Sequence, residues 1–471
     1  MAAPFTVLIM AAGQGTRMRS DVPKVLHRVA GKTLVEWVVD SARAAGAARV
    51  VAIVRPGDGV AEGLPDGVEI AEQREGEGTG AAVLAARDAV IGPDAGSGPC
   101  GSDGDGTVVV MSGDHPLVTV EQLQGLVEEH EQREAAATLL TTDKLDPAGY
   151  GRVVRDSSDT VERVFETKHP GRTPEELAVR EVNLGTYAFD AAALFAALQE
   201  VELEHGERYL PGVLPLLRGD GRTIAAFKTD DPDAAVGIND RAGLMRAEEI
   251  AQRRIIEAHA RSGVTFLHPG TTRVEAGVTI GSDTVIGPCT VLEGRTTIGE
   301  RCEVGPHTTL RDATIEEGAL VLHAFVVEAI VGPGVKVGPF AYLRPGTHVH
   351  AGAKVGTFVE VKNSDIGEGA KVPHLSYIGD ADVGEQSNLG ASTITANYDG
   401  REKHRTKLGK SVKTSVHTSL VAPLNVGDRA YTGAGSAITE DVPEGALAIA
   451  RERQKNIEGY ADRKDQEDSQ K

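Results

Sequence analysis

The first half of the chain alternates short apolar runs with longer segments of helical periodicity. The strands predicted there are PFTVLIMAAG, ARVVAIVRP and TVVVMSGDHPLV, and the helices between them are TLVEWVVDSARAAG and GAAVLAARDAV. Strands that alternate with helices favour a parallel sheet covered on both faces, with ligands at the carboxyl ends of the strands. We therefore predict an α/β domain over residues 1–235, with a surface loop at residues 93–106.

The pattern turns purely helical between residues 236 and 262. Leu244, Ile255 and Ile256 recur at helical spacing with charged residues between them, which predicts an amphipathic helix. This helix is either a linker between two domains or a cap on the first domain, and the pattern leaves both open.

After residue 263 the period changes to six residues. Aliphatic–glycine pairs recur at this step, for example Ile280-Gly281 and Ile286-Gly287, then Val331-Gly332 and Val337-Gly338, and the run ends near Val426-Gly427. Each hexapeptide can supply one short strand and one corner, with the aliphatic side chain pointing inward. We predict a parallel β-helix over residues 263–460 and a disordered tail over residues 461–471.

Charge and cysteine content narrow the classes of function. The 49 Lys and Arg residues against 69 Asp and Glu residues give a net charge of −20, which repels nucleic acids and anionic membranes. An anionic substrate therefore needs a local basic pocket. Three cysteines without metal-like spacing indicate a reducing compartment. Because no secretory leader or run of 18 apolar residues is present, we expect a soluble, cytoplasmic protein.

A glycine-rich loop, MAAGQGTRM (residues 10–18), directly follows the first strand. Glycines let backbone N–H groups approach a triphosphate closely, and Arg17 adds a positive charge. Lys24, in DVPKVL, can reach the same anion. Such a loop taken alone is also compatible with a simple tight turn, so the particular spacing to Pro23 and Lys24 carries the interpretation.

That spacing resembles the signature of the nucleoside-triphosphate sugar-1-phosphate transferases. Together with the hexapeptide half, residues 5–460 resemble the bacterial bifunctional N-acetylglucosamine-1-phosphate uridylyltransferases/glucosamine-1-phosphate N-acetyltransferases. The resemblance implies a Rossmann-like nucleotidyltransferase domain, a linker helix and a left-handed β-helix acetyltransferase domain, assembled as a homotrimer. It also implies the substrates glucosamine-1-phosphate, acetyl-CoA, N-acetylglucosamine-1-phosphate and UTP, with Mg²⁺ as cofactor, and neither nucleic-acid nor membrane partners.

The resemblance assigns roles to residues of the first domain. Asp114 and Asn239 are the implied Mg²⁺ ligands, and Arg17 and Lys24 neutralise the phosphates during catalysis. One carboxylate and one amide oxygen suit Mg²⁺, since phosphates complete its octahedron. The implied nucleotide- and sugar-binding set is Met10, Ala11, Ala12, Gly13, Lys24, Gln73, Gly78, Thr79, Ser112, Gly113, Asp114, Gly151, Glu166, Asn183 and Asn239.

A second set of residues belongs to the β-helix. Acetyl transfer to an amine requires loss of a proton, and an imidazole is a natural acceptor, so His374 in VPHLSYIGDA is the implied base. The residues implied for glucosamine phosphate are Arg344, Lys362, Tyr377 and Asn388, with Lys403 as an addition. Those implied for acetyl-CoA are Ala391, Asn397, Tyr398, Val416, Ala434 and Arg451.

The chain departs from the family pattern at three places. Ala81 stands where the family usually has His, and Tyr209-Leu210-Pro211-Gly212 replaces a Tyr-Leu-Thr-Asp pattern. Val416, in Ser-Val-His-Thr, replaces a serine beside acetyl-CoA, which predicts a weakened acetyl-CoA site. This departure keeps open the alternative of a monofunctional nucleotidyltransferase with a structural or impaired β-helix. Asp114, Asn239 and Lys24 speak against a third possibility, a non-enzymatic trimerisation scaffold.

Overall fold

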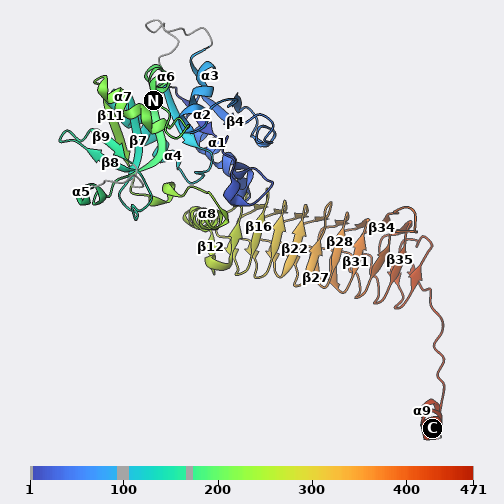
Figure 1. Ribbon diagram of the computed structural model, residues 1–471. Helices are drawn as coiled ribbons and strands as arrows, with labels where there is room; N and C mark the ends of the chain where they lie inside the picture. The colour runs from blue at the N-terminus through green and yellow to red at the C-terminus, as the bar shows by residue number, and fades with distance from the viewer. Residues whose placement is uncertain (1–3, 93–105, 166–172, 470–471) are drawn as a thin grey trace. The chain divides into compact units, whose positions relative to one another are not determined.

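The computed structural model describes residues 4–92, 106–165 and 173–469. The chain forms two compact units, Met1–Arg253 and Arg254–Lys471, which are coloured blue to green and yellow to red in Figure 1. The loop predicted at residues 93–106 lies outside the described residues except for Gly106.

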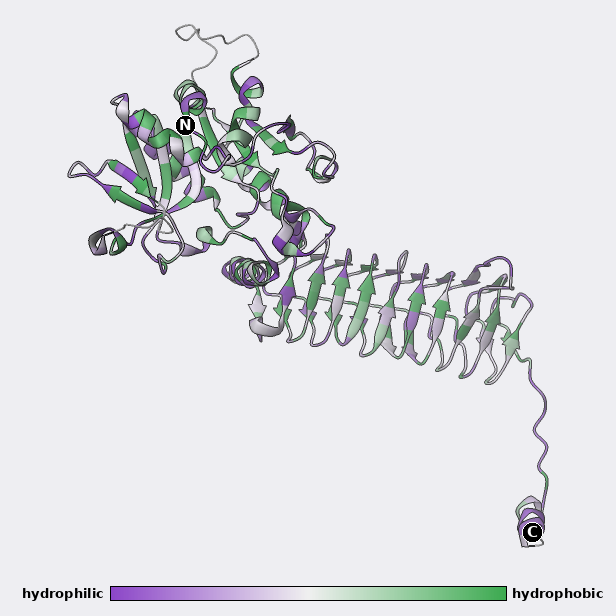
Figure 2. Ribbon diagram, in the orientation of Figure 1, coloured by the Kyte–Doolittle hydropathy of each residue, from purple (hydrophilic) through white to green (hydrophobic). Residues whose placement is uncertain are grey.

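The first unit is built around one mixed sheet. Its strand order is β11-β7-β10-β6-β1-β4-β5, with β8 paired to β10 and β9 paired to β8. The strands are β1 Thr6–Met10, β4 Arg49–Val54, β5 Glu69–Glu72, β6 Thr107–Ser112, β7 Ala137–Thr142, β8 Arg152–Arg155, β9 Val161–Phe165, β10 Val182–Asp190 and β11 Ile224–Lys228, beside the small pair β2 Arg28–Val29 and β3 Lys32–Thr33. Figure 2 shows these strands mostly in the hydrophobic colour, because apolar side chains on both faces form two cores.

The prediction of a parallel sheet is wrong for strand β10. Strands β1, β4, β5 and β6 are parallel, but β10 runs antiparallel to β6 and to β7. The physical reason lies in the connections: a helix carries the chain from β6 to β7, whereas the hairpin β8–β9 and the short helix α5 (Pro174–Leu177) precede β10. A return without a full crossover brings the strand back in the opposite direction.

Helices cover this sheet, and the two segments that the sequence predicts to be helical are among them. They are α1 Leu34–Ala44, α2 Thr79–Ala85, α3 Arg87–Ile91, α4 Val120–Gln132, α6 Ala191–Glu200 and α7 Val213–Gly219. Helix α1 begins at a capping box in which the Thr33 hydroxyl accepts from the Glu36 amide and the Glu36 carboxylate accepts from the Thr33 amide. The single helix predicted for GAAVLAARDAV is instead two, because Ala86 leaves helical geometry.

Helix α8 (Arg241–Arg261) occupies the segment predicted to be helical. Within the first unit, the Glu248 carboxylate accepts from the Ala30 amide at 2.7 Å, and Arg253 pairs with Asp233 at 2.6 Å. Within the second unit, Ile256 belongs to the β-helix core. The helix thus supplies side chains to each unit.

The second unit is a three-sided parallel β-helix in which each side is one ladder of short strands (Figure 1). The first side comprises β12 Thr265–Phe266, β15 Val285–Ile286, β18 Glu303–Val304, β21 Leu320–Val321, β24 Lys336–Val337, β27 Lys354–Thr357 and β30 Lys371–His374. The second comprises β13 Arg273–Val274, β16 Val291–Glu293, β19 Thr309–Arg311, β22 Ala324–Val327, β25 Ala341–Leu343, β28 Glu360–Lys362, β31 Tyr377–Gly379, β33 Ile394–Ala396, β35 Ser419–Val421 and β38 Ala437–Ile438. The third comprises β14 Thr279–Ile280, β17 Thr297–Ile298, β20 Thr314–Ile315, β23 Ile330–Val331, β26 His348–Val349, β29 Asp365–Ile366, β32 Ala381–Val383, β34 Thr406–Leu408 and β36 Leu424–Val426, and a last pair joins β37 Tyr431–Thr432 to β39 Leu447–Ala448.

The aliphatic–glycine repeat has a direct structural meaning. Aliphatic residues such as Val331 and Ile366 are fully buried in the prism, as predicted. Each following glycine lies against the next coil: a Cβ at Gly281 would come 2.6 Å from the Gly299 backbone, and one at Gly367 would come 2.7 Å from the Val383 carbonyl. Glycine is needed there because the coils stack too closely for a side chain.

The end of the chain differs from its prediction. Helix α9 (Tyr460–Ser469) occupies most of the tail predicted to be disordered. It has no buried residue and carries the hydrophilic colour in Figure 2, so no apolar packing holds it. Among the described residues, no helix combines the length and the apolar character needed to cross a bilayer.

Candidate active sites

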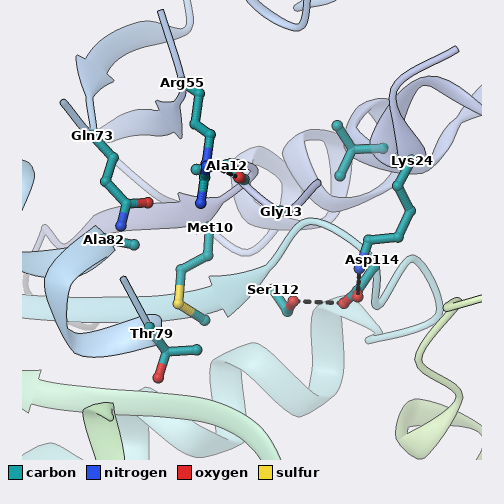
Figure 3. A pocket seen from close by; sticks show the side chains of 12 residues that line it. Met10, Ala12, Gly13, Lys24, Arg55, Gln73, Thr79, Ala82, Ser112 and Asp114 are labelled. Atoms are coloured by element: carbon teal, nitrogen blue, oxygen red, sulfur yellow. Dashed lines mark hydrogen bonds and ion pairs between the residues drawn. The ribbon is translucent and has the colours of Figure 1, made fainter. Parts of the chain in front are cut away.

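A pocket of about 280 Å³ opens at the carboxyl ends of β1, β4 and β6 in the first unit. Figure 3 shows Lys24 and Asp114 at one side of it and Gln73 and Thr79 at the other. Nine of its lining residues are among those that the sequence singled out: Met10, Ala12, Gly13, Lys24, Gln73, Gly78, Thr79, Ser112 and Asp114. The other three are Val25, Arg55 and Ala82.

Asp114 is the buried charge of this pocket. Its carboxylate forms an ion pair with the Lys24 ammonium, and its Oδ1 accepts from the Ser112 hydroxyl at 2.5 Å (Figure 3). Burial opposes ionisation of Asp114, but the nearby His115 and Lys24 and the hydrogen bonds from Lys24 and Ser112 outweigh it and lower the pKa. The carboxylate is therefore ionised at neutral pH although it is only 8% exposed.

Arg17 and Asn239 meet beside this carboxylate. The Arg17 guanidinium donates to the Asn239 Oδ1 at 2.9 Å. The backbone amide of Ile238 donates to the Asp114 carbonyl at 3.0 Å, which fixes the segment carrying Asn239 next to Asp114. The carboxylate of Asp114 and the side-chain amide oxygen of Asn239 are thus on adjacent segments. Each of these oxygens accepts a hydrogen bond from a cationic side chain.

The opposite side of the pocket is shaped by backbone contacts. Gly78 has a φ of +95°, and a Cβ there would come 2.4 Å from the Arg208 carbonyl, so glycine is required. The Thr79 hydroxyl accepts from the Leu210 amide at 2.9 Å. The Tyr-Leu-Pro-Gly segment that departs from the family pattern therefore positions α2 at the pocket.

Arg55 is a pocket residue that the sequence analysis missed. It follows β4, and its Nε donates to the Ala12 carbonyl at 2.8 Å, so it braces the glycine-rich loop. Its position after a strand of the parallel part of the sheet was the available signal, since ligand-contacting residues gather at such strand ends.

Four further candidates of this unit, Ala11, Gly113, Gly151 and Asn183, lie outside the pocket lining. Ala11 is buried, and its amide donates to the Ile53 carbonyl, while the Gly113 amide donates to the Met10 carbonyl. Gly151 and Asn183 are neighbours, because the Asn183 amide donates to the Gly151 carbonyl at 3.0 Å. Glu166 lies outside the described residues.

On the β-helix, Asp380 gathers several of the candidates. Its carboxylate accepts from the Asn363 amide at 2.6 Å, from the Asn397 amide and from the Lys362 ammonium at 3.4 Å. Burial opposes ionisation, but these three donors outweigh it and lower the Asp380 pKa. Asp380 was not among the predicted residues, and it holds two of them, Lys362 and Asn397, side by side.

The same region collects positive charge. The neighbouring Lys362 ammonium lowers the pKa of Lys403, with a further contribution from Arg344. Arg344 donates to Glu360 at 2.8 Å and lies 5.9 Å from the Tyr342 ring. The three cations Arg344, Lys362 and Lys403 face two carboxylates, Glu360 and Asp380, which leaves one positive charge in excess and suits a phosphate.

His374 ends β30 at an exposed corner of the prism. The turn at Leu375 and Ser376 separates it from Tyr377 on β31, which pairs in register with Glu360 on β28. Asn388 forms parallel β-bridges to Lys371, on β30, and to Lys413. It therefore lies on the first side of the prism, whereas Lys362 and Tyr377 lie on the second.

Most residues assigned to acetyl-CoA lie on the successive coils that follow His374 along the same corner of the prism. The Ser392 amide donates to the His374 carbonyl, the His417 amide to the Ala391 carbonyl, and the Gly435 amide to the Val416 carbonyl. A Cβ at Gly435 would lie 3.9 Å from the Arg451 side chain. Ala391, Val416, Ala434 and Arg451 thus follow one corner, while Tyr398 is 60% exposed and pairs with Lys403.

Comparison with known proteins adds evidence along the whole chain. The profile of the MobA-like NTP transferase domain matches residues 7–210, and that of the bacterial transferase hexapeptide (six repeats) matches residues 277–312. A curated relative named bifunctional protein GlmU from Mycolicibacterium vanbaalenii is 45% identical over 97% of this chain and 93% of its own. Those from Mycobacterium tuberculosis and Halalkalibacterium halodurans are 45% and 46% identical, covering 97% of this chain and 92% and 98% of their own.

This chain belongs to the bifunctional GlmU family. The match confirms the predicted α/β nucleotidyltransferase domain and left-handed parallel β-helix, and it confirms an enzyme that combines uridylyl and acetyl transfer. Its substrates include a nucleotide and a sugar phosphate, and GlmU nucleotidyl transfer generally uses a divalent metal ion.

Proposed function

We propose that this GlmU protein acetylates glucosamine-1-phosphate with acetyl-CoA and then joins the product, N-acetylglucosamine-1-phosphate, to UTP, releasing pyrophosphate. The similarity to bifunctional relatives over 97% of the chain is the observation that carries this proposal. The cations Lys24 and Arg17 at the pocket of the first unit and the cationic group around Asp380 in the second support one anion-binding site in each unit.

The pocket of the first unit is the proposed UTP site. The backbone N–H groups of Ala12 and Gly13 in the glycine-rich loop are proposed to bind the phosphates, and Gln73, Gly78 and Thr79 line the side where the base and ribose fit. Gly151 and Asn183 are proposed to hold the sugar, with Glu166 as a further contact.

Asp114 and Asn239 are the proposed protein ligands of Mg²⁺. The donor set fits this ion, since a buried ionised carboxylate and an amide oxygen on an adjacent segment are hard oxygen ligands. When bound, Mg²⁺ supplies positive charge that reduces the repulsion between the two phosphorylated substrates.

Lys24 and Arg17 supply the remaining neutralisation. The sugar phosphate is already an anion, so no base is needed to activate it, and the task of the side chains is alignment and charge stabilisation. Ion pairing with Asp114 holds Lys24 against the pocket, and the Asn239 amide holds Arg17 beside it. Both cations are therefore positioned before substrate binds.

For acetyl transfer, His374 is the proposed general base. Its exposed imidazole accepts the proton that the sugar amine loses while it attacks the thioester carbonyl, the C–S bond breaks, and the same proton passes to the departing CoA thiolate. Arg344, Lys362 and Tyr377 are proposed to bind glucosamine-1-phosphate, with Lys403 as a further contact, whereas Asn388 lies on another side of this chain's prism. Asp380 positions Lys362 and Asn397.

We also propose that the protein acts as a homotrimer whose β-helices pack together. One corner of the prism supports this, because Phe340 and Phe358 stack at 5.3 Å between ring centroids although they are 56% and 58% exposed. Exposed aromatic side chains in a row are typical of a surface covered by a partner.

Omission of single components tests the proposed reactions. Pure protein is incubated with glucosamine-1-phosphate, acetyl-CoA, UTP and Mg²⁺, and free CoA and pyrophosphate are measured as each is left out. We expect CoA release without UTP, and pyrophosphate release only with UTP and Mg²⁺ plus an acetylated sugar phosphate. Absence of CoA release would instead favour the monofunctional nucleotidyltransferase.

Replacing Val416 by serine tests the acetyl-CoA site. Val416 is 45% exposed on the proposed acetyl-CoA corner, and valine cannot form the hydrogen bond of a serine hydroxyl. One such bond contributes about 1 kcal/mol, so Val416→Ser should lower the KM for acetyl-CoA roughly fivefold. The measurement is the rate of CoA release at varied acetyl-CoA, with Val421→Ser, which is exposed on the neighbouring side, as the control. An unchanged KM in Val416→Ser would show that the departure is harmless.

A further inference from the structure

Two histidines and an aspartate converge on the third side of the β-helix, apart from the proposed acetyl-transfer residues. His348 and His350 flank the fully buried Val349, so both imidazoles point outward from the same face. Asp365 is the direct register partner of His348 on the next coil. The strand repeat thus fixes three side chains with metal-ligand chemistry at one spot.

The possible ligand atoms of the three side chains lie close together, and His350 is within hydrogen-bond distance of Asp365. The His350 Nε2 lies 3.4 Å from the Asp365 Oδ1, and the His348 Nδ1 lies 3.9 Å from the same oxygen. The two imidazole centroids are 3.8 Å apart. Since zinc ligands lie about 2.1 Å from the metal, neighbouring ligands of a tetrahedral zinc are about 3.4 Å apart. The observed spacing needs only small side-chain rotations to match.

The surroundings hold the carboxylate in place. Arg405 donates to the Asp365 Oδ2 at 3.4 Å, which leaves the Oδ1 toward the two imidazoles. The same guanidinium is paired with Asp382, so its charge is largely compensated. A partner that orients a ligating carboxylate from behind is a regular feature of protein metal sites.

We propose that His348, His350 and Asp365 form a binding site for a divalent transition-metal ion, of which Zn²⁺ fits best. Imidazole nitrogen with a carboxylate oxygen suits zinc, and two His ligands make the site a poor one for Mg²⁺ or Ca²⁺. Three protein ligands leave a fourth position for water, and the exposed setting leaves the ion accessible to solvent.

Metal titration of the full-length protein tests this site. Metal-free protein is titrated with Zn²⁺ in competition with a coloured chelator, and with Co²⁺ followed by visible absorption, in buffer containing excess Mg²⁺ to occupy sites that prefer that ion. We expect one tight zinc per chain and the intense absorption of tetrahedral Co²⁺. Loss of a group that merely supports a ligand typically weakens binding about tenfold or more, so His348→Ala and His350→Ala should weaken zinc binding at least tenfold.

Two further variants keep the result interpretable. Asp365→Asn preserves the shape of the side chain and should weaken zinc binding while the Co²⁺ spectrum loses intensity. His307→Ala is the matched control, because the His307 ring also packs near a histidine ring, that of His323, with 5.1 Å between the centroids. Neither of these histidines belongs to the proposed metal site. Equal zinc affinity in the wild type and in His348→Ala, His350→Ala and Asp365→Asn would overturn the proposal, as would an equal loss in His307→Ala.

Discussion

Replacing Asp114 by asparagine should lower uridylyl transfer about a hundredfold or more, while acetyl transfer continues at the wild-type rate. Asparagine keeps the size of the side chain but removes the negative charge that pairs with Lys24 and that is proposed to bind Mg²⁺. Losing one preorganised electrostatic contact in an active site typically lowers the rate by a factor of about 10²–10³. The measurement is pyrophosphate release from UTP and N-acetylglucosamine-1-phosphate at several Mg²⁺ concentrations.

A surface aspartate provides the matched control for Asp114→Asn. Asp40 also pairs with a lysine, Lys32 at 2.6 Å, but its side chain is 46% exposed and lies outside the pocket lining. Exposed ion pairs contribute little, so Asp40→Asn should leave both activities unchanged. Wild-type pyrophosphate release by Asp114→Asn would contradict the proposed uridylyl-transfer site.

Replacing His374 by alanine should produce the opposite pattern, with acetyl transfer reduced by a factor of about 10²–10⁴ and uridylyl transfer retained. The imidazole is exposed, so its removal should cost little stability, and the loss is expected in the rate of CoA release.

The control for His374 is another exposed histidine of the β-helix unit. His268→Ala removes an imidazole near the start of the prism, far along the chain from Tyr377 and Lys362, and should leave CoA release unchanged. The proposal fails if His374→Ala releases CoA as fast as the wild type.

Local patterns were sufficient to predict much of the second unit. A residue pointing inward and a glycine at the next corner are both consequences of a six-residue step, so Val331-Gly332 and Ile366-Gly367 could be placed without coordinates. In the first unit, strand and helix periodicity predicted β1, β4, β6 and α1 within a few residues. Resemblance to the family, rather than periodicity, assigned Asp114, Asn239 and His374.

The pairing of distant segments was decided by the tertiary structure. Strand β10 entered the sheet antiparallel because of the hairpin before it, and the helix predicted after Gly78 was broken at Ala86. Arg55 reached the pocket through its contact with Ala12, and Asp380 became the partner of Lys362 and Asn397. None of these features can be predicted from the spacing of apolar residues within a single segment.

The histidine–aspartate cluster separates the two contributions most clearly. The spacing of His348 and His350 alone determines that both side chains leave the same face of a strand. That Asp365 lies beside them depends on the number of residues in one coil and on the register of β26 with β29. Side-chain alternation is a property of a single strand, whereas register is a property of two, and only the folded prism brings the two strands together.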